Sequence, residues 1–139
     1  MPTRRTFLAT ALAAPMLMRP ALASDAVIKL RHLYDRQSIS DLAKTSEGTR
    51  IAVDGYMAPP LKAESRFFVL TRRPMSVCPF CETEADWPND ILAVYTKRLV
   101  EVVPYNVKIV ATGVLELGAL KDPETGFVSM VRLSDASYA

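Results

Sequence analysis

Two cysteines lie three positions apart in Cys78-Pro79-Phe80-Cys81, and they are the residues of this chain best suited to chemistry. A thiol pair at this spacing can close a disulfide, take part in thiol–disulfide exchange, or offer two soft ligands to a metal ion. The spacing alone does not choose among these three uses. Acidic residues follow the pair at Glu82, Glu84 and Asp86, and the single histidine is His32.

As a structural disulfide, Cys78 and Cys81 would be joined after export to an oxidising compartment. The loop that they close is short, so the chain-entropy relation with about 4 residues gives a stabilisation of only roughly 2 kcal/mol. Such a bridge would mainly fix the conformation of its own loop, and the protein would then be an interaction module.

As a metal site, the thiolates of Cys78 and Cys81 would bind zinc or copper(I), which both accept sulfur ligands. The chain has two cysteines and one histidine, which excludes a zinc site with four Cys or His ligands. Further ligands would come from the acidic residues after the pair, from His32, or from a partner protein. An incomplete site of this kind favours delivery of a metal over its storage.

As an exchange enzyme, the pair would need one thiol with a lowered pKa, and Arg72 and Arg73 could supply the positive charge. A thioredoxin-like site also belongs to a strand–helix–strand unit. Pro88 limits any helix after Cys81 to about two turns, and no such unit surrounds the pair. We therefore expect a protein that is not an enzyme, with thiol–disulfide exchange as the alternative.

Short strands are expected to position this cysteine loop, because Ile51 and Val53 alternate with Arg50 and Asp54 and further short apolar runs follow. The first predicted strand runs from Thr49 to the break at Ala58-Pro59-Pro60. The others are predicted at Arg66 to Thr71, Ile91 to Thr96, Val107 to Leu117 and Phe127 to Leu133, with Val100 to Val103 as a sixth strand or a crossing segment. The cysteines then lie between the second and third strands.

This many strands with little helix predicts an all-β domain over residues 48–139, a small OB-like antiparallel barrel of five to six strands. Gly55 and Gly113 lie inside predicted strands, where a glycine permits a bulge or a tight bend. Residues 24–47 are expected to form a lead-in that packs against the barrel through Leu30 and Leu33. Within it, Ser38 matches the N-cap of a short helix.

Residues 1–23 have the layout of a cleavable signal peptide. The basic start Met1–Arg5 precedes an uncharged apolar run, and Ala21-Leu22-Ala23 places small residues where a signal peptidase reads them. Spanning a membrane takes about 20 apolar residues, and Arg19 ends this run sooner. We expect cleavage after Ala23, no membrane span afterwards, and a periplasmic location.

The segment Thr3-Arg4-Arg5-Thr6-Phe7-Leu8 resembles the twin-arginine export signal. That resemblance implies a bacterial protein that is exported already folded. The alternative is an ordinary signal that happens to contain two arginines.

The net charge changes sign if the signal is removed. The chain has 17 basic and 15 acidic residues. Arg4, Arg5 and Arg19 lie in the signal and every acidic residue lies beyond it, so 14 basic and 15 acidic residues remain and the mature charge is −1. A near-neutral domain gives no electrostatic reason to expect nucleic-acid binding.

The stretch from Gly48 to Lys97 resembles a family of small exported bacterial proteins of unknown function. The matching residues are Gly48, Ile51, Gly55-Tyr56-Met57, Pro60-Leu61, Phe68, Leu70, Cys78 and Asn89. Several members are similar to accessory proteins encoded beside ABC-type transporters of zinc and other metals, which implies a transporter partner. Many relatives have Cys-x-His in the loop, whereas this chain has Phe80 and then a second thiol, Cys81. The leading prediction is a periplasmic binding protein that uses Cys78 and Cys81.

Overall fold

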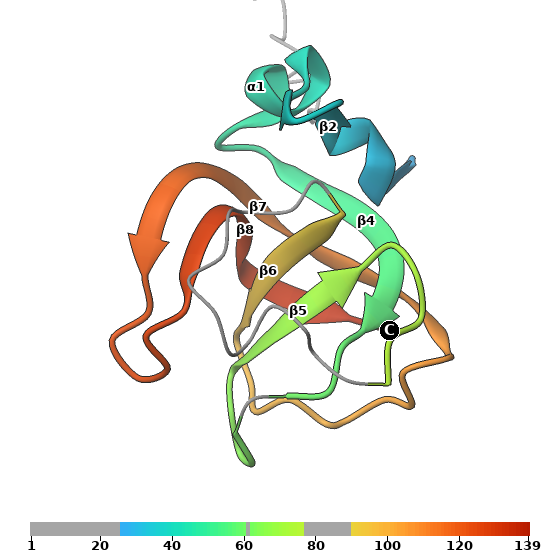
Figure 1. The fold of residues 1–139 in the computed structure, drawn as a ribbon, viewed down its shortest axis with the longest axis vertical. Coiled ribbons are helices and arrows are strands. Elements are labelled where there is room, and N and C mark those ends of the chain that lie inside the picture. Colours follow the sequence, from blue (N-terminus) through green and yellow to red (C-terminus); the bar gives the residue numbers. More distant parts are fainter. Residues whose placement is uncertain (1–25, 61, 77–89) are drawn as a thin grey trace, which may run out of the picture.

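The computed structural model describes residues 26–60, 62–76 and 90–139 (Figure 1). The elements in chain order are β1 (Val27–Lys29), the 3-10 helix η1 (Leu30–Leu33), β2 (Tyr34–Asp35), β3 (Ser38–Ile39), α1 (Asp41–Ser46), β4 (Arg50–Met57), β5 (Phe67–Thr71), β6 (Ile91–Thr96), β7 (Lys108–Lys121) and β8 (Val128–Tyr138). Strands dominate these residues, which confirms the all-β class with a short N-terminal helix. No helix in the described ranges is both long and apolar enough to cross a membrane.

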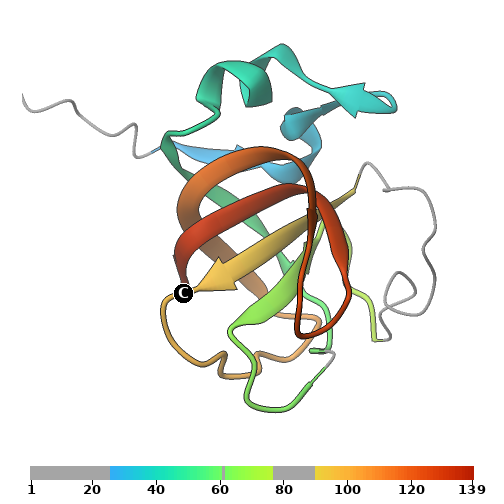
Figure 2. The same cartoon turned by 90° about the vertical axis from the view of Figure 1, so that its left-hand side faces the viewer.

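Five strands close a ring around one interior, in the order β4-β5-β6-β8-β7 and back to β4. Figures 1 and 2 show these strands wrapping around each other in a small barrel. The ring is mixed, however, and the expectation of a wholly antiparallel barrel is wrong for one of its pairs. β6 and β8 run parallel, with Ala93 opposite Arg132. β7 lies on the side of β8 that faces away from β6. The chain passes from β6 to β7 and then turns back into β8, so β8 runs in the same direction as β6.

The sixth strand of the sheet is β1, which comes from the lead-in. It pairs in parallel with β4, with Ile28 opposite Val53. β4 pairs with β5 only at Tyr56 and Met57, so β1 occupies the part of the β4 edge that β5 leaves open. The segment Val100 to Val103 is a crossing segment and not a strand.

Alternation along the strands separates two apolar clusters. The barrel interior holds side chains from every strand of the ring, among them Val53, Phe68, Leu70, Leu92, Val94, Leu115 and Leu133. Leu30 and Leu33 of η1 join this interior, as the sequence predicts. The opposite face of β5 and β6 carries a second buried cluster, formed by Ala58, Phe67, Val69, Ile91 and Ala93. β5 is therefore buried on both faces.

The two strand glycines lie where the barrel has no room for a side chain. A Cβ on Gly113 would come within 2.8 Å of the carbonyl oxygen of Ser134, and the register of β7 against β8 shifts between Thr112 and Val114. A Cβ on Gly55 would meet the carbonyl oxygen of Thr71 at 2.8 Å. The expectation of a bulge is thus met at Gly113, and Gly55 permits a close approach of β4 to β5.

The short helix α1 begins two residues later than the sequence suggests. Its N-cap is Ser40, whose hydroxyl accepts a hydrogen bond from the backbone N–H of Ala43 at 3.2 Å. Ser38 lies in β3 and pairs with Asp35, so its assignment as the N-cap is wrong. The β2–β3 pairing holds Ser38 in extended backbone, and the first free cap position comes after it.

Candidate functional site at the stem of the cysteine loop

Cys78 and Cys81, the predicted metal or redox pair, lie outside the described residues, as do Glu82, Glu84 and Asp86. The structure does describe the stem on both sides of their loop. The stem consists of residues 72–76, which follow β5, and Asp90, which precedes β6. Its geometry shows how the barrel holds the two ends of the loop.

The antiparallel pairing of β5 with β6 continues to the start of the loop. Thr71 is opposite Ile91 at the end of the ladder. One step further, the backbone N–H of Arg72 donates to the carbonyl of Asp90 at 3.1 Å. The two ends of the loop are therefore held next to each other by backbone hydrogen bonds.

The buried hydroxyl of Thr71 fixes the backbone that leaves β5. Its Oγ1 lies 2.7 Å from the carbonyl oxygen of Arg73 and 3.3 Å from that of Tyr56 on β4. Thr71 is 1% exposed, so little water competes for this hydroxyl. The direction of the chain after β5 is thus set by a side chain of β5 itself.

The lead-in braces the other end of the loop. The hydroxyl of Tyr34, on β2, donates to the carbonyl of Ile91 at 2.6 Å. The preceding helix η1 anchors this tyrosine, because Leu30 and Leu33 are both fully buried in the barrel interior. A segment 57 positions earlier in the chain therefore supports the first residue of β6.

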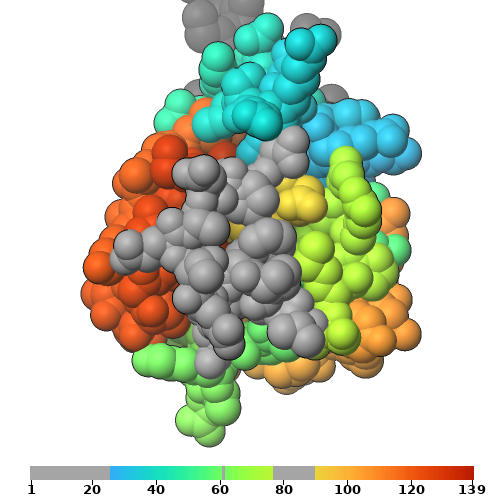
Figure 3. Space-filling model, viewed as in Figure 1, coloured from blue at the N-terminus to red at the C-terminus, as the bar shows by residue number. Residues whose placement is uncertain are grey.

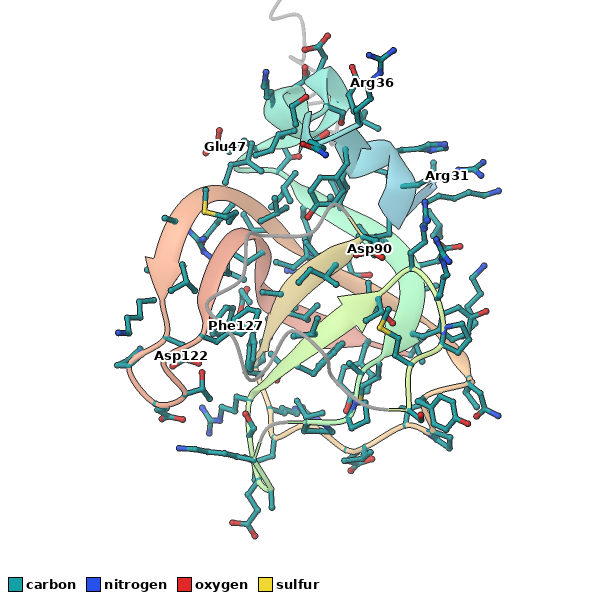
Figure 4. The ribbon with its side chains drawn as sticks, viewed as in Figure 1. Arg31, Arg36, Glu47, Asp90, Asp122 and Phe127 are labelled. Carbon is teal, nitrogen blue, oxygen red and sulfur yellow. The ribbon has the colours of Figure 1, made fainter. Side chains whose placement is uncertain are left out.

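The charges of the stem are exposed on one side and partly covered on the other. Arg72 and Arg73 are exposed, whereas Asp90 is half-buried at the start of β6 (Figure 4). Neither arginine forms an ion pair with another described residue. Two cationic side chains thus lie within the stem next to the thiol loop.

His32, the candidate third ligand, is an exposed residue of η1. Its Nε2 accepts a weak hydrogen bond from Nε of Arg31 at 3.4 Å. Within the described ranges, no three His, Cys, Asp or Glu side chains are grouped closely enough to hold a metal ion.

A buried arginine, which the sequence analysis did not single out, holds the hairpin of β7 and β8. Arg132 is 8% exposed. Its Nε donates to Oε2 of Glu116 at 2.9 Å, and its Nη1 donates to the carbonyl of Gly118 at 2.7 Å. In the sequence, the sign of a buried arginine is its place between two aliphatic residues of an apolar strand, Val131-Arg132-Leu133. Because both contacts bridge β8 to β7 beside an irregular register, Arg132 stabilises the hairpin.

The hydroxyl of Tyr95 is buried and has no hydrogen-bond partner among the described residues. Burial raises the pKa of Tyr95, and the carboxylate of Asp122 raises it further. Ser129 and Arg132 oppose this rise in pKa, and the Ser129 hydroxyl itself lies 3.5 Å from the carbonyl oxygen of Leu120. Asp122 and Phe127 lie at the turn of the β7–β8 hairpin (Figure 4), and the Phe127 ring packs 5.2 Å from Phe67. The second apolar cluster is thus bordered by a polar edge, which consists of Tyr95, Asp122, Ser129 and Arg132.

Comparison with known proteins shows a likeness in fold to a solved structure. No family model matches the chain, and no curated protein matches it. Among solved structures, it is similar to a DUF3299 family protein from Pseudomonas aeruginosa, with 14% sequence identity and a TM-score of 0.50. The likeness covers 82% of this chain and 95% of that protein. At this identity, the two share a fold, and the neighbour comes from a bacterial family of unknown function.

Proposed function

We propose that this chain is an exported bacterial protein of the periplasm that binds zinc or copper(I) through Cys78 and Cys81. In this proposal, residues 1–23 form a twin-arginine signal that is removed on export. The barrel is OB-like, which its strand order supports. Its role is to present the thiol pair, and the protein is not an enzyme.

The observation that carries the proposal is the fastened stem. Backbone pairing at Thr71–Ile91 and at Arg72–Asp90 holds the ends of the loop together. Hydroxyl groups of Thr71 and Tyr34 then hold each end from the side. A loop with fixed ends has less conformational freedom to lose when it binds a ligand, so more of the ligand contact energy becomes affinity.

A two-thiol site leaves metal coordination positions open, so we propose that a second protein completes it. The family resemblance implies that this partner is an ABC-type membrane transporter. Delivery to such a partner requires a metal that is bound and then released, which suits an incomplete ligand set.

The test is stoichiometric metal binding by the reduced protein. Reduced wild type is expected to bind one zinc or copper(I) ion, and the Cys78→Ser/Cys81→Ser variant is expected to bind none. Leu42→Ser is the matched control, because Leu42 is exposed on α1 and belongs to none of the candidate ligands, and it should bind as wild type does. Absence of zinc and copper(I) binding by the reduced wild type would overturn the metal proposal.

The arginines of the stem favour thiol–disulfide exchange as the second candidate. Arg72 and Arg73 are exposed and without an ion pair among the described residues, and a nearby cation lowers a thiol pKa. Exchange predicts a thiolate pKa well below about 8.5 and turnover in a disulfide-reduction assay. A reduction potential below about −300 mV would instead indicate a structural bridge in an interaction module.

A further inference from the structure

The connection between β6 and β7 exposes a row of large apolar side chains. Leu99, Val102, Tyr105 and Val107 are 53%, 68%, 43% and 45% exposed. They make up half of the eight large hydrophobic residues that are exposed in the described chain. Isolated exposed apolar residues are normal on a protein surface, but a concentration of them in one connection marks an interaction site. We call these four side chains the apolar row.

The backbone of this connection is fixed, so the row does not result from a loose chain. The N–H of Val100 donates to the carbonyl of Ser65 at 2.8 Å. The hydroxyl of Tyr138 accepts from the N–H of Glu101 at 2.7 Å and lies 2.8 Å from its carbonyl oxygen. Val100 and Val103 pack against the barrel core. With these residues held inward, the backbone holds the apolar row outward.

The apolar row lies beside a second connection, between β4 and β5. Pro60, residues 62–65 and two valines, Val100 and Val102, line one shallow depression. Figure 3 shows the two connections next to each other at the bottom of the molecule. In Figures 1 and 2, both lie at the end of the barrel opposite the lead-in and α1. The row is therefore part of one end surface.

Positive charge borders this end surface. Residues 58–66 and 97–108 contain five basic and two acidic residues, which are Lys62, Arg66, Lys97, Arg98 and Lys108 against Glu64 and Glu101. Lys97 and Lys108 form ion pairs with Asp135 and Asp54 at 3.4 and 3.0 Å. Arg66 and Arg98 are exposed and form no ion pair with any described residue. Their charge is available to an anionic partner.

We propose that this end of the barrel binds the surface of an anionic lipid bilayer. Apolar side chains can enter the boundary of the acyl chains while Lys and Arg contact lipid phosphates. A tyrosine such as Tyr105 suits the headgroup level, because its ring is apolar and its hydroxyl is polar. A second copy of the chain fits less well, because a two-fold interface would bring the same positive border against itself.

The test is co-sedimentation of the protein with vesicles of phosphatidylcholine, with and without phosphatidylglycerol. The variant that removes two side chains of the apolar row is Leu99→Ser/Val102→Ser, which we call the strip variant. Its matched control is Leu120→Ser/Val128→Ser, which removes two exposed apolar side chains from the β7–β8 hairpin instead. All variants keep the same N-terminal residues, so any contribution of these residues to vesicle binding is equal in each.

Wild type and the hairpin control are expected to sediment with the anionic vesicles, while the strip variant binds about tenfold more weakly. Arg66→Glu/Arg98→Glu should weaken binding roughly fivefold or more for each charge, and raised salt should do the same. Equal binding by wild type and the strip variant would overturn the proposal. The proposal would also be overturned if neither protein bound vesicles and light scattering showed that wild type is a dimer and the strip variant a monomer.

Discussion

Two tyrosine hydroxyls in this protein have opposite hydrogen-bond states, and this difference should be visible in stability. The hydroxyl of Tyr34 donates to the carbonyl of Ile91 at 2.6 Å, whereas the buried hydroxyl of Tyr95 lacks a partner in the part of the chain that the structure describes. Tyr34→Phe should lower the free energy of unfolding by about 1 kcal/mol, because a buried carbonyl loses its donor. Tyr95→Phe should leave it unchanged or raise it by up to about 1 kcal/mol, because no bond is lost. Urea denaturation of both variants measures the difference.

The stability of the protein at alkaline pH gives a second test of the buried Tyr95 hydroxyl. The pKa of Tyr95 is raised above its ordinary value of 10.0, chiefly by burial. The folded protein therefore holds this proton more tightly than the unfolded chain does. The stabilising contribution is complete below pH 10 and is lost as pH rises through the folded-state pKa. Wild type should lose stability in that range more steeply than Tyr95→Phe; parallel pH profiles would contradict this assignment.

Among the elements, α1 tests which of two serines directs the chain into the helix. Ser40→Ala should lower the free energy of unfolding by about 1–2 kcal/mol, because the N–H of Ala43 loses its acceptor. The hydroxyl of Ser40 also donates to the carbonyl of His32 at 2.6 Å, so the same change loosens η1 from α1. Denaturant unfolding of the variant measures the cost.

Ser38→Ala is the matched control, since both serines lie before the same helix. The hydroxyl of Ser38 makes an exposed hydrogen bond with the carbonyl of Asp35 at 2.8 Å, so its removal should change stability by less than about 0.5 kcal/mol. A larger loss in Ser38→Ala than in Ser40→Ala would mean that the β2–β3 hairpin, and not the cap, orders the lead-in.

Strand positions could be predicted from the sequence because each depends on local composition, which alternates in β4 and is mostly apolar in β5 and β6. β6 at Ile91–Thr96 was predicted with its observed bounds, since turn-forming residues flank it. The parallel pairing of β6 with β8 could not be predicted, because it depends on which strands become neighbours across the barrel. The same holds for β1, whose three residues become a strand only at the open edge of β4.

The residue types of the candidate site could be predicted from the sequence, but the contacts that hold the ends of its loop could not. The Cys78–Cys81 motif is visible in the sequence, and the structure contributes the stem that fastens its loop. Tyr34 and Ile91, 57 positions apart, carry no sequence signal of their contact. Arg132 was missed for a similar reason, because an arginine in an apolar strand is buried only when another strand supplies its acceptors.

For the whole molecule, proposed export by the twin-arginine route predicts a dependence on the arginine pair itself. Arg4→Lys/Arg5→Lys keeps the positive charge of the N-terminus, so a general secretory signal should tolerate it, whereas a twin-arginine signal should not. The variant is expected to remain in the cell at full length, while wild type reaches the periplasm as residues 24–139. Arg19→Lys, outside the motif, is the control and should be exported normally.

Intact mass of the periplasmic and cytoplasmic fractions measures both outcomes. The same spectrum shows whether the exported protein carries two thiols, a disulfide or a metal ion. Normal export of the lysine pair would rule out the twin-arginine route, and the protein would then have to fold around its cysteine loop after crossing the membrane.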